Sequence, residues 1–150
     1  MILSAILKKS EKMKMETLKV DWDGPWGDYR RLFEFRYSKL CKTGTLRLLT
    51  SKRPMVEKTR NGYHVYFFAA VEKYLPQTIR SMYEVLLGDD VNRAMYNVCE
   101  KSDILFVSKN GKKTKYDKKK SDALYEIIIK ISRMKKVKVL EWVGEDRHIP

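Results

Sequence analysis

An Asn-Gly pair between two strand-like segments restricts the possible folds more than any other feature of this chain. Asn61-Gly62 separates residues 55–59 from residues 63–70, where aromatic and apolar residues predominate. Asn-Gly readily adopts the backbone conformations of tight hairpin turns, so the pattern predicts two adjacent antiparallel strands. His64 lies at the start of the second strand. Side chains alternate along a strand, so we expect His64 on the opposite face from Tyr63 and Val65.

The other segments mix strands with helices. Strands are expected over residues 16–22, 45–50, 103–107 and 137–143, and helices over residues 26–41, 76–87, 89–100 and 117–134. Three of these helices carry apolar stripes at helical spacing: Trp26, Tyr29, Phe33, Tyr37 and Leu40; Ile79, Met82, Tyr83, Leu86 and Leu87; and Leu124, Ile127, Ile128, Ile131 and Met134. This order favours an α+β fold, a mostly antiparallel sheet with helices packed largely on one face.

The totals indicate one domain over residues 1–150, with 43% hydrophobic residues. No apolar run reaches the roughly 18 to 20 residues that a membrane span needs, so no membrane partner is expected. Residues 1–15 are expected as a peripheral N-terminal helix, and residues 144–150 as a loose tail. Cys41 and Cys99 lack metal-ligand spacing. We expect reduced core cysteines in a cytoplasmic protein.

The formal net charge of +13 favours polyanionic partners, nucleic acid before an anionic membrane surface. Seven lysines crowd residues 109–120: Lys109, Lys112, Lys113, Lys115, Lys118, Lys119 and Lys120. Lysines near a helix N-terminus oppose the helix dipole, so those at 118–120 suit phosphate contacts better than helix stability. A solvated loop, or a Lys-rich surface without a polyanionic ligand, is the alternative.

Asp21 and Asp23 follow the apolar part of the first expected strand and point to the same face, because side chains repeat every two residues. Neighbouring carboxylates repel unless one is protonated or a cation lies between them. Mg²⁺ and Mn²⁺ prefer such oxygens, together with water and phosphate. The alternative is that both carboxylates cap the turn and the helix that follow.

The residues before His64 could hold a phosphate. Lys58, Thr59 and Arg60 supply two cations and a hydroxyl beside the backbone N–H groups of the Asn-Gly turn. A histidine between apolar residues on a strand is also a common hydrogen-bonded structural residue, so this role for His64 is a hypothesis.

These two segments resemble motifs of the archaeo-eukaryotic primase superfamily, which includes the primase–polymerases of plasmids and viruses. Residues 20–23, Val-Asp-Trp-Asp, resemble its first motif, an Asp-x-Asp strand. Residues 59–67, Thr-Arg-Asn-Gly-Tyr-His-Val-Tyr-Phe, resemble its second, a Gly-Tyr/Arg-His strand. The resemblance covers about residues 16–70. It implies an RRM-like or primase-core-like sheet.

The resemblance also implies roles for single residues. Asp21 and Asp23 would bind the catalytic metal ions, Mg²⁺ or Mn²⁺, and His64 would contact the phosphates of the incoming nucleotide beside Lys58, Thr59 and Arg60. The family's third motif is a further acidic residue on a neighbouring strand. Glu141 fits the apolar-acidic pattern of that motif, and Asp103, Asp89 and Asp90 are rivals.

Two readings of function follow. In the first, the chain is a small metal-dependent nucleotidyltransferase that uses a nucleoside triphosphate. In the second, it is a non-catalytic, basic DNA- or RNA-binding protein of an archaeal virus or plasmid with a degenerate primase-like fold. DNA is favoured over RNA in both. A protein-interaction factor whose charge is incidental is a third reading.

Overall fold

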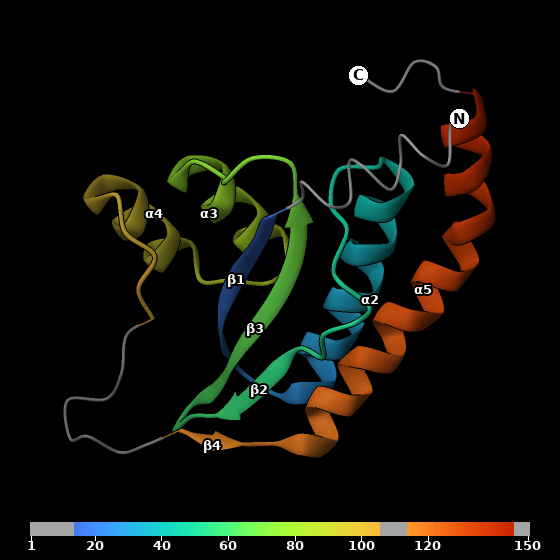
Figure 1. The fold of residues 1–150 in the computed structure, drawn as a ribbon. Helices are drawn as coiled ribbons and strands as arrows, with labels where there is room; N and C mark the ends of the chain where they lie inside the picture. The colour runs from blue at the N-terminus through green and yellow to red at the C-terminus, as the bar shows by residue number, and fades with distance from the viewer. Residues whose placement is uncertain (1–13, 106–113, 146–150) are drawn as a thin grey trace.

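The computed structural model describes residues 14–105 and 114–145, with side chains placed as far as residue 133. Its elements, in chain order, are β1 (Lys14–Asp23), α2 (Trp26–Lys42), β2 (Met55–Lys58), β3 (Gly62–Val71), α3 (Gln77–Leu86), α4 (Val91–Glu100), β4 (Lys115–Tyr116) and α5 (Lys118–Glu145). Figure 1 shows their arrangement.

The four strands form one antiparallel sheet in the order β1-β3-β2-β4. β1 pairs with β3 along its whole length, from Lys14 opposite Val71 to Asp23 opposite Gly62. β2 pairs with the first part of β3 across the predicted hairpin turn, where Thr59 N donates to Gly62 O at 2.9 Å. The expected α+β fold and the hairpin are therefore confirmed.

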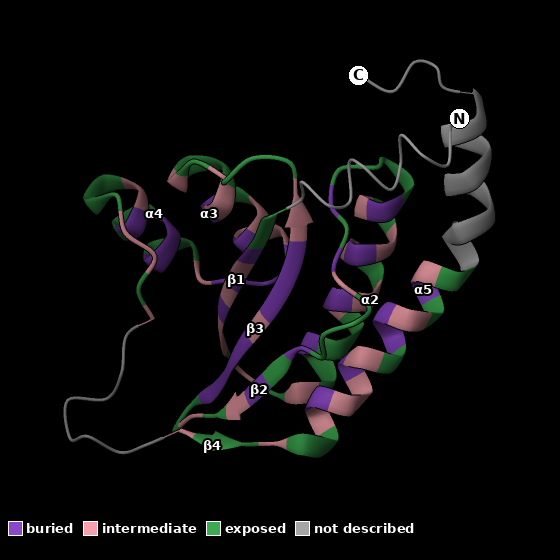
Figure 2. Cartoon of the chain, viewed as in Figure 1, coloured by how far each residue is buried: buried purple, intermediate pink, exposed green. Residues whose placement is uncertain are grey.

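The core lies between one face of the sheet and the helices α2 and α5. Figure 2 shows the buried residues on β3 and on the facing sides of both helices. The rings of Phe33 on α2 and Phe67 on β3 stack with their centroids 5.0 Å apart. The aromatic and aliphatic stripes predicted for α2 and α5 supply this core, including Tyr29, Tyr37, Leu124 and Ile128.

α3 runs along the free edge of β1, and α4 packs against α3. An edge strand leaves backbone groups unpaired, and here side chains take the place of a further strand. Glu84 accepts a hydrogen bond from Lys19 N at 2.6 Å, and Asp89 accepts one from Asp21 N at 2.7 Å. Arg93 donates to Lys19 O at 3.4 Å.

Three expected strands differ from the structure. Residues 45–50 form only an isolated bridge between Leu48 and Ala69. Of the strand expected over residues 103–107, residues 103–105 form none, and residues 106 and 107 lie outside the described part of the chain. The strand predicted over residues 137–143 is wrong, because α5 continues through Glu145. No glycine or proline interrupts the sequence between Lys118 and Val143, so the helix has no local stop signal, and its continuation overrides the β propensity of the valines.

Further predictions concern the two ends of the chain and the two cysteines. Residues 1–13 and 146–150, which hold most of the expected N-terminal helix and tail, lie outside the described part of the chain, while Lys14 belongs to β1. Cys41 is buried as expected, but Cys99 is exposed.

The apolar stripe predicted for α3 is only partly used by the main core: Leu87, just beyond the helix, is buried in it, and Tyr83 packs against it. Ile79 and Met82 are 36% and 48% exposed, whereas Ser81 and Glu84 are the buried residues of this helix. The reason is that α3 turns the side bearing Glu84 toward the edge of β1 and leaves its apolar side outward.

Gly62 tests the hairpin geometry, because a Cβ atom at this position would lie 1.8 Å from the carbonyl oxygen of Trp22. We expect Gly62→Ala to lower the free energy of unfolding by about 3 kcal/mol, since β1 and β3 must separate locally to admit the methyl group. Chemical denaturation measures the change. Gly27→Ala is the control, since a Cβ there meets nothing within 4 Å. Equal stability of the two variants would contradict this register.

Candidate functional site

The face of the sheet that points away from α2 and α5 carries a group of polar side chains. Residues paired across antiparallel strands share a face, and the register pairs His64 with both Asp21 and Glu57. Asp23 is opposite Gly62, which has no side chain. Asp21, Asp23 and His64, which the sequence singled out, therefore lie on one face, together with Glu57, which it did not. We call these four residues the polar face.

His64 lies at the centre of the polar face with only 5% of its side chain exposed. Its Nε2 is 3.6 Å from Oδ1 of Asp21. Burial lowers the pKa of His64, so the ring is neutral at pH 7 and the contact is not an ion pair. The distance also exceeds that of a hydrogen bond. A phosphate at His64 would thus meet one neutral N–H donor with little exposed surface.

Asp21 lies in a negative environment. Burial, followed by the nearby carboxylates of Asp23 and Asp90, raises the pKa of Asp21 to about 6, against the opposing effect of Arg93. A carboxylate with a raised pKa gains more from a cation than an ordinary surface carboxylate does. A divalent cation at the polar face would therefore reduce the repulsion between these carboxylates.

Arg93 on α4 holds the carboxylates beside the polar face. Its side chain is fully buried, with Nη1 2.5 Å from Oδ2 of Asp89 and Nη2 3.1 Å from Oδ1 of Asp103. Glu84 lies 3.5 Å from Nη1. Since Asp89 also accepts the N–H of Asp21, the guanidinium fixes the backbone of the site through one intermediate carboxylate.

The predicted phosphate-binding turn is largely committed to its own structure. The Nζ of Lys58 donates to the carbonyls of Thr59 and Gly62 at 2.8 and 3.2 Å. The hydroxyl of Thr59 accepts from Gly62 N at 3.0 Å. Arg60 is exposed at the tip of the turn. These hydrogen bonds use two of the three N–H donors of Lys58 and only an acceptor position of Thr59, so they hold both side chains at the turn and leave donors that a phosphate could use.

The predicted lysine cluster divides into three groups. Lys109, Lys112 and Lys113 lie outside the described residues, and Lys115, Lys118 and Lys119 are exposed at β4 and the start of α5. Lys120 serves the fold: its Nζ lies 2.9 Å from Asp117, which caps α5, and 5.5 Å from the centre of the Tyr63 ring. It is therefore the weakest of the described candidates for nucleic-acid contact.

The third carboxylate remains the least defined part of the site. Glu141 lies on α5 and not on a strand, in the part of the helix whose side chains are not described. Of its rivals, Asp89 and Asp103 bind Arg93, and Asp90 caps α4 by accepting from Asn92 N at 2.9 Å. Within the described residues, no group of three or more His, Cys, Asp or Glu side chains is arranged to hold a metal ion.

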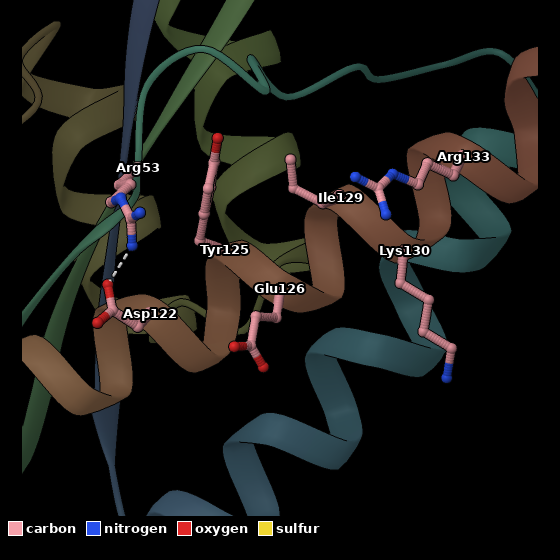
Figure 3. A pocket seen from close by; sticks show the side chains of 7 residues that line it. All are labelled: Arg53, Asp122, Tyr125, Glu126, Ile129, Lys130 and Arg133. Atoms are coloured by element: carbon pink, nitrogen blue, oxygen red, sulfur yellow. Dashed lines mark hydrogen bonds and ion pairs between the residues drawn. The ribbon is translucent and has the colours of Figure 1, made fainter.

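A large hollow lies away from the polar face. It measures about 790 Å³ and lies along α5, where Asp122, Tyr125 and Lys130 line it together with Arg53 (Figure 3). Arg53 is bonded to Asp122 and lies over the ring of Tyr125. Because α5 covers the core side of the sheet, this hollow does not adjoin Asp21 or His64, and its mixed charges do not single out a ligand.

Comparisons with protein-family models, with curated proteins and with solved structures gave no match to this chain. Among the helices of the described residues, none is long and apolar enough to span a membrane.

Sequence reasoning missed Glu84 and Arg93, which organise the edge of β1, and Glu57 on the polar face. For Arg93 a local signal exists: Asp89 precedes it by four residues at the start of a helix, the spacing of an ion pair. For Glu57 the sequence offered no such signal, because a turn centred on Asn61-Gly62 would place Thr59 opposite His64, whereas the structure pairs Glu57 with His64.

The raised pKa of Asp21 predicts a pH-dependent gain in stability on its removal. The folded state holds the Asp21 proton more tightly than the unfolded state, so wild-type stability is lost as pH rises from about 4 through 6. Asp21→Asn cannot ionise and should gain about 1–3 kcal/mol over wild type above pH 6, and almost nothing at pH 3.5. Urea unfolding at several pH values measures this difference.

The control for this measurement is Asp28→Asn on α2, an exposed carboxylate paired with Arg31. Its effect should stay within about 0.5 kcal/mol across the same pH range. A pH-independent effect of Asp21→Asn would contradict the proposed electrostatics of the polar face.

Removing Arg93 should strand the carboxylates that it binds. We expect Arg93→Met to lower the free energy of unfolding at pH 7 by about 3–5 kcal/mol, because the buried carboxylate of Asp89, whose pKa burial raises to about 6, loses its partner. The loss should shrink at pH 4, where protonation removes the negative charges. Arg31→Met, which breaks an exposed pair, should cost less than about 1 kcal/mol. A mild, pH-independent effect at Arg93 would show that this cluster does not hold the edge.

Proposed function

We propose that this chain is a nucleic-acid-associated protein of the cytoplasm whose polar face binds a divalent metal together with a nucleoside triphosphate, as a small primase-like nucleotidyltransferase. The observation that carries the proposal is the pairing of Asp21 with His64 on adjacent strands, with Asp23 on the same face. Two segments chosen from their sequence motifs, some forty residues apart in the chain, thus meet at one place.

Asp21 and Asp23 are the residues that would hold the metal. Mg²⁺ commonly binds proteins through one or two carboxylates and completes its shell with water and substrate phosphates. With Asp21 and Asp23 as its only proposed protein ligands, the metal is expected to bind weakly alone and more tightly with a triphosphate. When bound, the metal would neutralise phosphate charge and orient the reacting oxygens.

His64 and Asp21 have separate roles in this proposal. Asp21 supplies negative charge, while the neutral ring of His64 supplies a hydrogen-bond donor beside it. The backbone of Asp21 is held by Asp89, so the strand that carries the carboxylate is in place before any ligand arrives. Glu141 stays a prediction as the third carboxylate.

Titration of Mn²⁺ into the protein, with and without a nucleoside triphosphate, tests the proposal. We expect the triphosphate to tighten Mn²⁺ binding at least about tenfold, and Asp21→Asn with Asp23→Asn to abolish that binding. His64→Gln should reduce the effect of the triphosphate on Mn²⁺ binding. The affinity for Mn²⁺ in the absence of triphosphate should stay as in wild type. Calorimetry or electron paramagnetic resonance reports the affinity, and circular dichroism checks the fold of each variant.

The matched control removes two carboxylates elsewhere, Asp28→Asn with Glu72→Gln, both exposed and away from the polar face. This variant should bind Mn²⁺ and triphosphate as wild type does. Equal loss in both double variants, or no specific Mn²⁺ binding in wild type, would reject the metal site.

A non-catalytic nucleic-acid-binding function is the second candidate, and the exposed lysines favour it. Lys115, Lys118 and Lys119 gather where β4 leads into α5, on a chain of net charge +13. Lys118 also pairs with Asp122 at 3.5 Å, yet its side chain is 78% exposed. Binding of this kind depends on phosphate charge and needs neither Asp21 nor His64.

Replacing these three lysines by glutamine should weaken binding to duplex DNA and flatten its salt dependence. Each lost phosphate contact reduces the magnitude of the negative slope of log affinity against log salt by about 0.9. The three together should reduce it by about 2 to 3. Fluorescence anisotropy at several salt concentrations measures the slope. The control replaces Lys39, Lys42 and Lys73, also exposed, with the same loss of charge. Identical slopes for both triple variants would place the contact elsewhere.

A further inference from the structure

Tyr116 on β4 extends the face that carries the candidate metal ligands as far as the opposite edge of the sheet (Figure 1). One row of paired residues crosses all four strands on this face: Asp21, His64, Glu57 and Tyr116. Residues paired in this way share a face of the sheet. Thr114, two residues before Tyr116, has the same orientation, because its hydroxyl donates to Oε2 of Glu57 at 2.8 Å.

The Tyr116 end of this row is an exposed apolar surface. Tyr116 is 50% exposed, and Met55, its diagonal neighbour on β2, is 43% exposed. Diagonal neighbours on one face lie about 7–8 Å apart, within reach of large side chains. Tyr66, which pairs with Met55, is partly exposed beside them. A half-exposed aromatic ring next to apolar side chains is available to a flat apolar ligand.

The spacing along the row suits a nucleotide. Neighbouring strands lie about 4.8 Å apart, so two strand spacings separate His64 from Tyr116 by about 10 Å. A nucleoside triphosphate carries its charge at one end and a flat aromatic base at the other, and its extended form can bridge this separation. With the phosphates at His64, the sugar would lie over Glu57, whose carboxylate can accept a hydrogen bond from a sugar hydroxyl.

We propose that Tyr116 stacks on the base of the nucleoside triphosphate whose phosphates lie at Asp21 and His64. This inference rests on the proposed function of the polar face. Stacking on an aromatic ring tolerates every base, because each base has a π-face. The ring of Tyr116 and the thioether of Met55 do not read the hydrogen-bonding edge of a base. The ligands are therefore nucleoside triphosphates as a class, without selection of one base.

Inorganic tripolyphosphate separates the two ends of this site, because it has the phosphates of the ligand but neither sugar nor base. In the presence of Mn²⁺, calorimetry should show that wild type binds adenosine triphosphate about tenfold more tightly than tripolyphosphate. Tyr116→Ala should lose this preference and keep its affinity for tripolyphosphate. Tyr116→Phe should retain the preference, because stacking needs the ring and not the hydroxyl.

The control is Tyr74→Ala, which removes a tyrosine that is 66% exposed in the segment before α3. It should bind both compounds as wild type does, and circular dichroism checks the fold of each variant. A full preference for adenosine triphosphate in Tyr116→Ala would overturn the stacking role, while binding of tripolyphosphate would leave the metal site intact. Failure of wild type to bind tripolyphosphate with Mn²⁺ would reject the polar face itself, and this inference with it.

Photolabelling gives a second test that needs no substitution. An azido derivative of adenosine triphosphate carries its reactive group on the base. With Mn²⁺ it should label the peptides that contain Tyr116 or Met55, as mass spectrometry reports, and excess adenosine triphosphate should suppress the labelling. Labelling centred on α3 or α4, or unaffected by the competitor, would contradict a base site at Tyr116.

Discussion

The buried guanidinium of Arg93 is the interaction on which the arrangement of this molecule depends. β1 is an edge strand, and its outward N–H groups at Lys19 and Asp21 need acceptors. They receive the carboxylates of Glu84 and Asp89, which burial would otherwise make costly. Arg93 contacts both acids and so lets them remain there. α3 and α4 are thus attached to the edge of β1 through buried polar groups, while Tyr83 and Leu87 pack with the apolar core.

Two properties of the surface follow from this attachment. Because the polar sides of α3 and α4 contact the edge of β1, their apolar sides face outward and form a groove. Because Asp89 holds the N–H of Asp21 and Asp90 adds its charge nearby, the strand end carries a concentrated negative potential. The apolar groove and the candidate metal site are thus two consequences of one buried cluster.

Local patterns in the sequence were sufficient for the hairpin and for the main core. Asn61-Gly62 indicated a hairpin here, but the turn that forms has Arg60 and Asn61 at its centre, with Thr59 N bonded to Gly62 O. The pairing register therefore came from the structure and not from the Asn-Gly pair. Tyr29, Phe33 and Tyr37 recur every four residues and so lie on one side of α2, which indicated the side that would be buried. These features rest on neighbours within one or two turns of the chain, which the sequence displays directly.

Long-range polar contacts could not be predicted in this way. Nothing adjacent to Glu84 indicates that its partner is a backbone group 65 residues away, and its apolar neighbours suggested that the opposite side of α3 would be buried. Residues 137–143 were misread because alternating valines resemble a strand, while helix continuation depends on the absence of a stop signal. The pairing of Asp21 with His64 follows from the order of strands, which only the assembled sheet defines.

Paramagnetic relaxation by Mn²⁺ would locate the metal most directly. In the ¹H–¹⁵N spectrum of the protein with a nucleoside triphosphate, sparing amounts of Mn²⁺ should broaden the amides of Asp21, Asp23 and His64 first. Amides along the outer side of α5, near Asp122 and Glu126, should stay sharp. Broadening centred on α5, or spread evenly over exposed carboxylates, would contradict a metal and nucleotide site on the polar face.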